Sequence, residues 1–327
     1  MRDDMTYGPS DIRLGLGCSR LVNAPCSAEM SQSIYAVHAA MDAGIRMFNT
    51  AEFYGCGDSE CALGEALQDG RRERAYISDK FGAMVGPDGG MYGLDVRPHN
   101  VKNHLAYSLK RLRTDYIDLY QPGRIDLAIP VEEIVGAVAE MVEQGYVREI
   151  GLTQVDADTL RRADKVHHIS YVELEYSLFN RSIEAELSPT ARELGIRIVP
   201  FGALAHGLLS GSCRRNPEDM MQNRIPIFAE KNIDRNLELV ERLKVIAEEK
   251  DADVAQLAVA WMLHKGEDII PLVGSRQADH ILHALGAARI TLTGEDMERI
   301  ESAVPREEVA GLTFPQMEFE NGVAVRR

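Results

Sequence analysis

The sequence predicts an α/β protein of the (β/α)8 type, a TIM barrel folded as a single domain over residues 1–327. Three observations support this fold. Strand-like and helix-like segments alternate along most of the chain, and eight segments have strand character. The strands are strongly apolar, as in a parallel sheet that is covered on both faces. No linker divides the chain, and no GxGxxG motif follows the first strand, which disfavours an open doubly wound sheet.

The predicted strands are short apolar runs, and amphipathic helices lie between them. In chain order the strands are Leu14–Cys18, Arg46–Asn49, Ala75–Lys80, Tyr116–Gln121, Arg148–Thr153, Tyr171–Glu175, Ile196–Phe201 and Ile269–Leu272. The helices have apolar residues three or four positions apart, which places them on one stripe. Such stripes comprise Val101, Leu105, Leu109 and Leu112 in the third helix, and Val131, Ile134, Val135, Val138, Met141 and Val142 in the fourth.

Three segments depart from the regular repeat. About thirty residues after the seventh strand, from Gly202 to Ile233, show little periodicity, and so long a loop is usually functional. An extra helix, Val254–His264, precedes the eighth strand and contains the single tryptophan, Trp261, which we expect in the core. The tail over residues 305–327 has no helical stripe. We assign it to one mouth of the barrel, with a tail that lacks fixed structure as the alternative.

The composition narrows the class of partner. With 36 basic and 51 acidic residues the net charge is −15, which disfavours nucleic acid and anionic membranes. No apolar run approaches the roughly 20 residues of a membrane span, and the polar N-terminal residues do not resemble a secretory signal. The five cysteines form no CxxC pair, so we expect reduced thiols and a cytoplasmic protein. No pattern predicts an oligomeric state.

Two polar side chains end neighbouring strands and predict an active site. Tyr54 lies in a glycine-bounded loop after the second strand, and Lys80 ends the third strand. In barrels of this type the working face is built from the loops at the carboxyl ends of the strands. We therefore expect the phenol and the ammonium to share a pocket. There the charge of Lys80 would lower the pKa of Tyr54 and make it a usable proton donor or acceptor.

A second cluster follows the eighth strand and predicts an anion site. Gly274, Ser275 and Arg276 precede the predicted helix Gln277–Ala287. Free backbone amides at a helix start, together with a hydroxyl and a guanidinium, can bind a phosphate group. We favour this interpretation over a capped helix that carries a surface arginine. Barrels of this type often bind phosphate beside the last two strands. The histidine pairs of the chain have no acidic or cysteine partners at ligand spacing, so we expect no metal site.

With these motifs in order, the chain resembles the aldo-keto reductase family, whose members are NADPH-dependent (β/α)8 enzymes that reduce aldehydes and ketones. The resemblance extends from Leu14 to about Ala303. Its most specific pieces are Gly44–Gly55 (GIRMFNTAEFYG) with Glu60 and Gly64–Leu67, Arg111–Tyr120 (RLRTDYIDLY), Gly145–Thr153 (GYVREIGLT), Glu175–Leu178 (EYSL) and Gly207–Gly211 (GLLSG).

The resemblance implies a catalytic set of Asp, Tyr, Lys and His. Tyr donates the proton, Lys lowers its pKa, Asp pairs with Lys, and His orients the substrate. Tyr54 and Lys80 match the family, whereas Asn49 stands at the Asp position and Gly123 at the His position. Without the carboxylate, we expect burial to lower the pKa of Lys80. We expect Gly123 to enlarge the pocket.

The same resemblance implies a set of cofactor contacts for NADP(H). Ser275 and Arg276 match the binders of the 2′-phosphate, and Gly207–Gly211, with Gly207, Leu208 and Ser210, matches the pyrophosphate clasp beside Gly274. Three positions depart from the family. Glu173 replaces the Gln that holds the nicotinamide amide, Thr153-Gln154 replace a Ser-Asn or Ser-Glu pair, and His283-Ala284 replace the Glu/Gln-Asn pair near the adenine.

Three further residues have open roles. His206 could donate a proton or bind phosphate, although a loop histidine without a catalytic role is favoured. Arg124 could clamp a substrate carboxylate or phosphate, or pair with Asp126 or Glu132 at the rim. Glu52 is interpreted as a solvated loop carboxylate.

Three functions follow from these residues. The first is an NADP(H)-dependent oxidoreductase that reduces an aldehyde or ketone, with Tyr54 as proton donor. A specialised biosynthetic pathway is one setting for this reaction. The second is a lyase, dehydratase or isomerase that uses Tyr54 and Lys80 on a carbonyl substrate. The third is a nucleotide-binding homologue without catalysis. The partner of the first two is a small carbonyl compound whose identity the sequence does not specify.

Overall fold

The barrel forms as the sequence predicts. The structure is a computed structural model that describes residues 13–21, 27–211, 213, 222–313, 318–320 and 323–325. Eight parallel strands lie in the order β10-β1-β2-β3-β6-β7-β8-β9. Their bounds are β1 (Gly15–Gly17), β2 (Met47–Ala51), β3 (Tyr76–Phe81), β6 (Ile117–Pro122), β7 (Val147–Thr153), β8 (Ile169–Glu175), β9 (Arg197–Phe201) and β10 (Leu272–Val273). Ile198 of β9 exchanges backbone hydrogen bonds of 2.9 Å with Asp268 and Ile270 just before β10, which closes the ring.

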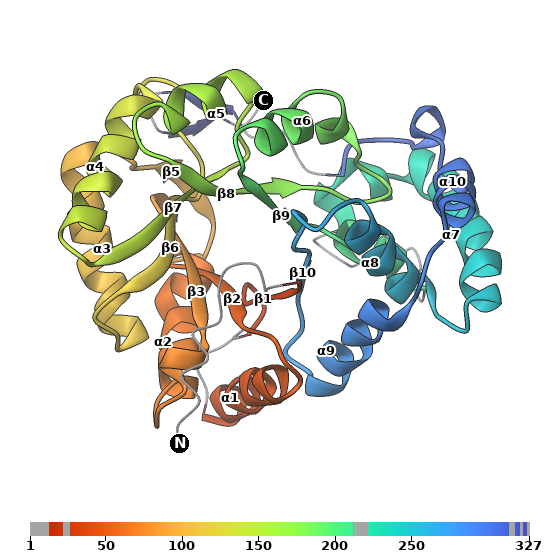
Figure 1. The fold of residues 1–327 in the computed structure, drawn as a ribbon, viewed down its shortest axis with the longest axis horizontal. Helices are drawn as coiled ribbons and strands as arrows, with labels where there is room; N and C mark the ends of the chain where they lie inside the picture. The colour runs from red at the N-terminus through yellow and green to blue at the C-terminus, as the bar shows by residue number, and fades with distance from the viewer. Residues whose placement is uncertain are drawn as a thin grey trace.

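Ten α-helices of the described residues pack around the strands (Figure 1). They are α1 (Ser27–Asp42), α2 (Asp58–Ala66), α3 (Pro98–Leu112), α4 (Val131–Glu143), α5 (Ala157–Asp164), α6 (Leu187–Glu193), α7 (Glu230–Glu249), α8 (Val254–His264), α9 (Ala278–Leu285) and α10 (Gly294–Ala303). The predicted stripes of α3 and α4 face the strands, because Val101, Leu105, Ile134 and Val138 are buried. None of the helices in the described residues has the length and hydropathy to cross a membrane.

Strand alternation divides the interior of the barrel into an apolar and a polar part. Met47, Leu119, Tyr171, Val199, Ile270 and Leu272 form a separate buried cluster. Because successive side chains of a strand point to opposite faces, residues two positions further along β2, β6 and β8 share the interior with this cluster. Those residues are Asn49, Gln121 and Glu173, and all three are buried. The barrel interior is therefore apolar towards the amino ends of the strands, which we call the floor of the barrel, and polar towards their carboxyl ends.

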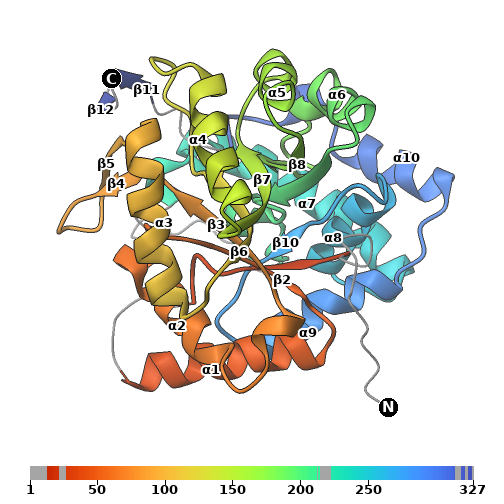
Figure 2. The ribbon, with the colours of Figure 1, turned by 60° about the vertical axis from the view of Figure 1, so that its left-hand side comes forward.

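A small antiparallel sheet was not predicted. It has the order β11-β12-β5-β4, with β4 (Ala83–Val85) and β5 (Met91–Leu94) directly after β3 and with β11 (Glu318–Glu320) and β12 (Val323–Val325) from the C-terminal tail. Val323 of β12 lies opposite Gly93 of β5. Figure 2 shows the two hairpins together, beside α3 and α4. Strands of three or four residues are too short for a two-residue alternation to identify them.

The segment after β9 contains more helix than its lack of periodicity suggested. Within the predicted loop the described residues form short turns of 3-10 helix, and α7 already begins at Glu230. The bounds of α8, Val254–His264, agree with the predicted extra helix. Trp261 is fully buried, which confirms its assignment to the core.

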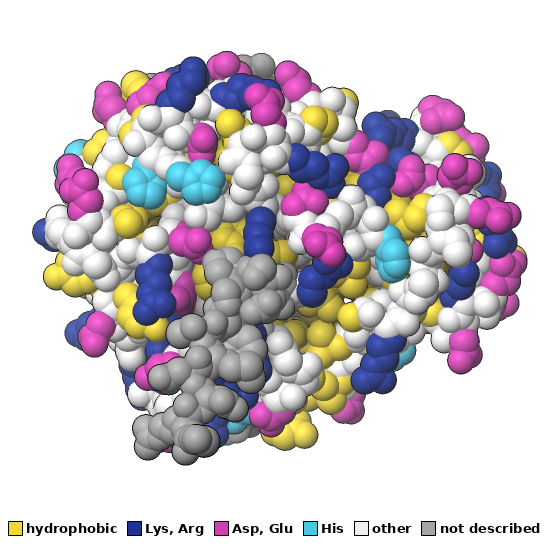
Figure 3. All heavy atoms as spheres, viewed as in Figure 1, with side chains coloured by type: hydrophobic (Ala, Val, Ile, Leu, Met, Phe, Trp, Pro, Cys, Tyr) yellow, Lys and Arg dark blue, Asp and Glu magenta, His cyan; other side chains and the backbone are white. Residues whose placement is uncertain are grey.

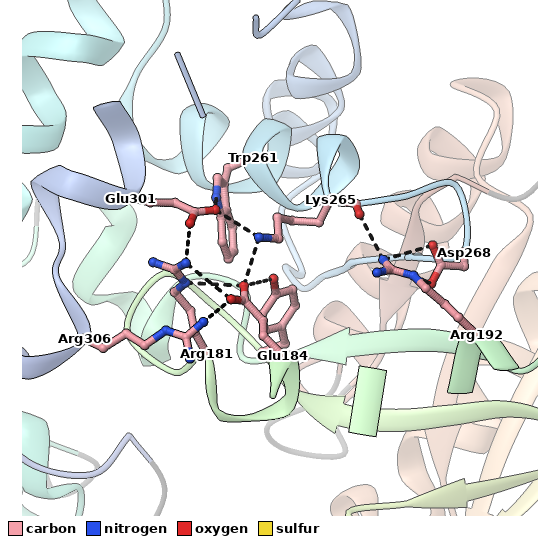
Figure 4. A network of polar contacts seen from close by, with 9 residues as sticks. Arg181, Glu184, Arg192, Trp261, Lys265, Asp268, Glu301 and Arg306 are labelled. Atoms are coloured by element: carbon pink, nitrogen blue, oxygen red, sulfur yellow. Dashed lines mark hydrogen bonds and ion pairs between the residues drawn. The ribbon is translucent and has the colours of Figure 1, made fainter. Parts of the chain in front are cut away.

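A polar network attaches this extra helix to the rest of the barrel (Figure 4). The Trp261 indole donates a 3.1 Å hydrogen bond to Glu301 of α10, and Lys265 lies 3.0 Å from the same carboxylate. Arg181, after β8, also pairs with Glu301, and Glu184 accepts from Lys265 at 3.1 Å. Charged groups in such a network support one another more than an isolated surface pair does. Over the face in Figure 3, acidic and basic side chains are interspersed.

Gly64 permits α2 and α3 to cross closely, and this generates a stability prediction. A Cβ at Gly64 would lie 2.5 Å from the Arg111 carbonyl oxygen and 2.7 Å from the Leu112 carbonyl carbon, both backbone atoms. We expect Gly64→Ala to lower the free energy of unfolding by about 1–3 kcal/mol. Gly136→Ala in α4 is the control, because a Cβ there has no neighbour within 4 Å; this change should raise it by about 0.5–1 kcal/mol. Urea denaturation measures both, and a neutral Gly64→Ala would contradict so close a crossing.

Asp79 generates a prediction for the pH dependence of stability. It is fully buried, and neither carboxylate oxygen has a hydrogen-bond partner among the residues described. Burial raises the pKa of Asp79 well above its usual range, and the charges of Glu60 and Glu52 add to this effect. Because the pKa is higher in the folded than in the unfolded state, this group destabilises the fold as the pH rises between the two values.

The asparagine in Asp79→Asn cannot ionise, so this variant should not lose stability in this way as the pH rises. Relative to the parent protein, we expect the variant to gain stability as the pH rises from about 4, the unfolded pKa, towards neutrality. Denaturation curves for both proteins across this interval measure the effect. Parallel pH profiles would show that the Asp79 carboxyl is not held protonated.

Candidate active site

Four buried polar side chains meet inside the barrel, towards the carboxyl ends of the strands. Asn49, Lys80, Gln121 and Glu173 come from β2, β3, β6 and β8, and none is more than 3% exposed. We call them the Lys80 cluster. Each points inward because of the strand alternation described above. Polar groups so deeply buried require partners, and the four residues supply them to one another.

The Glu173 carboxylate is the centre of the Lys80 cluster. Its Oε2 atom accepts hydrogen bonds from Asn49 Nδ2 at 2.7 Å, Gln121 Nε2 at 2.6 Å and Lys80 Nζ at 3.2 Å. Its Oε1 atom also lies 3.2 Å from Lys80 Nζ. Lys80 in turn donates to Asn49 Oδ1 at 2.5 Å, and the second Asn49 N–H bond is directed at Ser78 Oγ, 3.1 Å away. The asparagine thus bridges the lysine and the glutamate.

This geometry corrects the expectation for Lys80. Burial acts to lower the pKa of Lys80, but the Glu173 carboxylate and the Tyr54 phenol outweigh it, and the pKa is raised. The predicted lowering was wrong because the missing charge at position 49 is present at position 173. The sequence did not reveal this, because Lys80 and Glu173 are 93 residues apart.

Tyr54 lies directly above the Lys80 cluster. It begins a 3-10 turn, Tyr54–Gly57, that follows β2 and needs left-handed backbone at Gly55 (φ 59°) and Gly57 (φ 98°). Lys80 Nζ is 5.2 Å from the centre of the Tyr54 ring. Burial raises the pKa of Tyr54, and Lys80 opposes that effect as predicted without reversing it. The phenol is therefore protonated at neutral pH, as a proton donor must be.

Gly123 does not enlarge the pocket, contrary to the prediction. A Cβ at this position would lie 2.8 and 2.9 Å from two ring carbons of Phe53. The Phe53 ring therefore fills the space beside the glycine, and it packs edge-on against Tyr54 with the ring centres 5.1 Å apart. Phe53 is a site residue that the sequence reasoning missed. Its position next to Tyr54 was the available signal.

A cavity of about 610 Å³ extends from this site towards α9. Asn49, Tyr54 and Glu173 line one part of it, and Gly274 and Ser275 line another. Predicted residues on its wall also include Phe201, His206, Gly207, Ser210, His283 and Ala284, while Ser19, Arg20, Asp253 and His280 were not predicted. Arg276 follows Ser275 but does not line the cavity.

The polar atoms on the cavity wall and directly beside it fit a dinucleotide. Thr153 Oγ1 is buried without a hydrogen-bond partner among the described residues, and Thr153 pairs in register with Glu173. Gly207 has a φ of 99° and open space where a Cβ would stand, so the backbone is accessible to a phosphate. Ser275 Oγ accepts the Gln277 amide at 3.0 Å at the start of α9. The unpaired Thr153 hydroxyl, next to Glu173 in register, suits a nicotinamide, and the open backbone at Gly207 suits a phosphate.

Four predicted cofactor contacts lie off the wall of this cavity, namely Thr153, Gln154, Leu208 and Arg276. Gln154 Oε1 accepts the Glu175 amide at 2.8 Å, and Gln154 lines a separate pocket of about 310 Å³. Leu208 is fully buried and does not line the cavity. Gln154 has left-handed backbone, with a φ of 51°. The sequence pattern does not predict this conformation, and so it did not predict the contact of the Gln154 side chain with the Glu175 backbone.

The three residues with open roles all lie near this site. His206 lines the cavity, and its Nε2 atom is 3.8 Å from Glu175 Oε1. Burial lowers the pKa of Arg124, while Glu173 and Tyr54 act in the opposite direction, so its guanidinium lies near the Lys80 cluster. Glu52 is not a solvated carboxylate, because it pairs with His104 at 2.9 Å and accepts the Gly82 amide at 2.7 Å.

Comparison with known proteins agrees with this architecture. The sequence profile of the Aldo/keto reductase family matches residues 13–305. The "Probable aldo-keto reductase 1" of Glycine max is 38% identical over 311 residues, which are 94% of this chain and 89% of that protein.

Two solved structures share the fold. The glycerol dehydrogenase AKR11B4 from Gluconobacter oxydans has a TM-score of 0.83 at 26% identity, covering 91% of this chain and 96% of its own. The holo form of aldo-keto reductase AKR11C1 from Bacillus halodurans has a TM-score of 0.75 at 26% identity, covering 90% and 92%. The family profile and the Glycine max relative each cover most of the chain, and this protein belongs to the aldo/keto reductase family.

Proposed function

We propose that this protein is an NADP(H)-dependent oxidoreductase that reduces an aldehyde or ketone, with Tyr54 as the proton donor. The observation that carries the proposal is the protonated Tyr54 phenol beside a charged Lys80 at the end of a large cavity. Family membership supports the reaction class. A relative named as a glycerol dehydrogenase supports it further, since alcohol oxidation is the reverse of carbonyl reduction.

The residues of the chain have separate tasks in this reaction. NADPH, when bound, would supply the hydride. Tyr54 donates its proton to the carbonyl oxygen, and the nearby ammonium of Lys80 stabilises the phenolate that remains. Glu173 and Asn49 hold Lys80 in place through the contacts already described. The Phe53 ring forms an apolar wall beside Tyr54 and limits the access of water.

The cofactor contacts are proposed along the same cavity. Thr153 and Glu173 would face the nicotinamide, with Gln154 behind them. Gly207, Leu208, Ser210 and Gly274 would present backbone and hydroxyl groups to the pyrophosphate, and Ser275 and Arg276 would bind the 2′-phosphate. A positively charged guanidinium close to the start of α9 supports the last assignment, because both favour an anion.

The raised pKa of Lys80 favours reduction over the non-redox alternative. A lyase or isomerase that used Lys80 as a base would need the neutral amine at working pH. The Glu173 carboxylate keeps this amine protonated instead. A protonated lysine suits stabilisation of a developing phenolate.

Tyr54→Phe tests the proposed proton donor. We expect turnover of NADPH with a panel of aldehydes and ketones to fall by about 10²–10⁴-fold, because the general acid is lost. NADPH affinity, followed by fluorescence titration, should change little, since the ring remains. Tyr107→Phe, an exposed tyrosine on α3, is the matched control and should leave both quantities unchanged. Undiminished turnover in Tyr54→Phe would refute the assignment, as would a parent protein that does not bind NADPH.

Arg276→Ala tests the proposed recognition of the 2′-phosphate. A hydrogen bond between charged groups contributes about 1.5–3 kcal/mol, so we expect the Kd for NADPH to rise roughly 10-fold or more. The Kd for NADH, which lacks the phosphate, should not change. Arg289→Ala, an exposed arginine after α9, serves as the control. An unaltered ratio of the two affinities would rule out Arg276 as the phosphate ligand.

A further inference from the structure

We infer that Glu173 is a positioning residue for catalysis, and that Asn49 and Glu173 form an exchangeable pair in which the amide and the carboxylate have traded places. The resemblance to the family places a carboxylate at position 49 and an amide at position 173, whereas this chain has the reverse. The inference rests on the proposed function for its kinetic readout, but not for its structural basis.

The contacts give Glu173 this task. Glu173 is the carboxylate that pairs with Lys80 in the described residues, with both oxygens 3.2 Å from Nζ. Lys80 is 2% exposed and Glu173 3%. Removing one member of a buried pair leaves an uncompensated charge, which is strongly unfavourable. The position of Lys80, and through it the environment of Tyr54, therefore depends on Glu173.

The same contacts limit any role of Glu173 as a cofactor ligand. Its Oε2 atom already accepts three hydrogen bonds, from Asn49, Gln121 and Lys80. A side chain held on this many sides cannot turn towards a ligand without breaking the Lys80 pair. Glu173 borders the cavity, so a nicotinamide would meet a carboxylate whose orientation is fixed by the lysine.

The exchange keeps one carboxylate and one amide beside Lys80, so the residue suited to one position depends on the residue at the other. Asn49 Nδ2 and Glu173 Oε2 are 2.7 Å apart. With an aspartate at position 49 and a glutamine at position 173, the same hydrogen bond could form with donor and acceptor reversed, and Lys80 would pair with position 49 instead. With carboxylates at both positions, two negatively charged oxygens would be forced into contact. With amides at both positions, the lysine would have no counter-charge.

The other ionisable groups around Lys80 do not replace Glu173. The Cys18 thiol has its pKa raised by burial to about 12 and is neutral. Asp79 precedes Lys80 on β3 and faces the opposite side of the strand, where burial raises its pKa. Tyr54 is protonated, and Arg124 adds positive charge. Glu173 is thus the group whose negative charge offsets that of Lys80.

A cycle of four proteins tests the inference: the parent, Asn49→Asp, Glu173→Gln and the double variant. We expect each single change to lower kcat/KM for NADPH-dependent carbonyl reduction by 10-fold or more. The double variant should recover to within about threefold of the parent. In Glu173→Gln alone, the alkaline limb of the pH–kcat/KM profile should move to lower pH, because Lys80 loses its proton more readily. The double variant should restore the limb.

A spectroscopic readout separates this inference from the proposed function. The ultraviolet absorbance of tyrosinate, measured against pH with the matching Tyr54→Phe protein subtracted, reports the ionisation of Tyr54 without any turnover. We expect the titration midpoint to change in each single variant and to return in the double variant. This pattern would support the exchange even if no carbonyl compound were reduced, in which case only the redox proposal would fail.

Asp118→Asn controls for the general loss of a buried carboxylate. Asp118 is 4% exposed on β6 and pairs with Arg72 at 2.8 Å, outside the active site. This variant should lose stability and keep the pH profile of the parent. A double variant no better than the poorer single variant, or a Glu173→Gln protein with an unshifted alkaline limb and an unshifted Tyr54 titration, would overturn the inference.

Discussion

The buried ion pair between Lys80 and Glu173 is the constraint on which the active site depends. An ammonium that is 2% exposed requires a compensating charge and enough acceptors for its protons. Asn49 and Glu173 supply both, and Gln121 holds the carboxylate from the other side. Since these groups come from four strands, the cluster exists only when the barrel is closed in the observed order. The stability of the fold and the charge state of Lys80 are therefore linked.

The barrel provides this cluster with two contrasting environments. Below it, Met47, Leu119, Tyr171 and their neighbours form an apolar floor. Above it, Tyr54 and Phe53 form a partly apolar roof. A low-dielectric setting strengthens the interaction between the ammonium and the carboxylate. It also raises the cost of an ionised phenol, which explains why Tyr54 remains protonated although a positive charge lies close by.

The departures from the family pattern change different physical properties of the site: its charge, its space and its hydrogen bonds. Asn49 and Glu173 relocate a charge, and the 2.7 Å hydrogen bond between them supports our inference that the two changes belong together. Gly123 lacks the side chain expected at this position, and the missing Cβ leaves room for the Phe53 ring. Gln154 turns its amide to the Glu175 backbone. At the first two positions another residue of this chain supplies the charge or fills the space, so the absence of the expected residues does not by itself indicate a lost activity.

The amino-acid sequence alone was enough to predict the order of the eight barrel strands, the bounds of α8, the burial of Trp261 and the placement of Tyr54 and Lys80 at strand ends. These features depend on local periodicity and on the side-chain alternation of single strands, which a sequence displays directly. The folded barrel was needed to learn that Glu173 pairs with Lys80, that Phe53 fills the space beside Gly123, and that the C-terminal strands extend the β4–β5 hairpin. These features are contacts between residues distant in the chain, and their free energies depend on packing distances that no local pattern encodes.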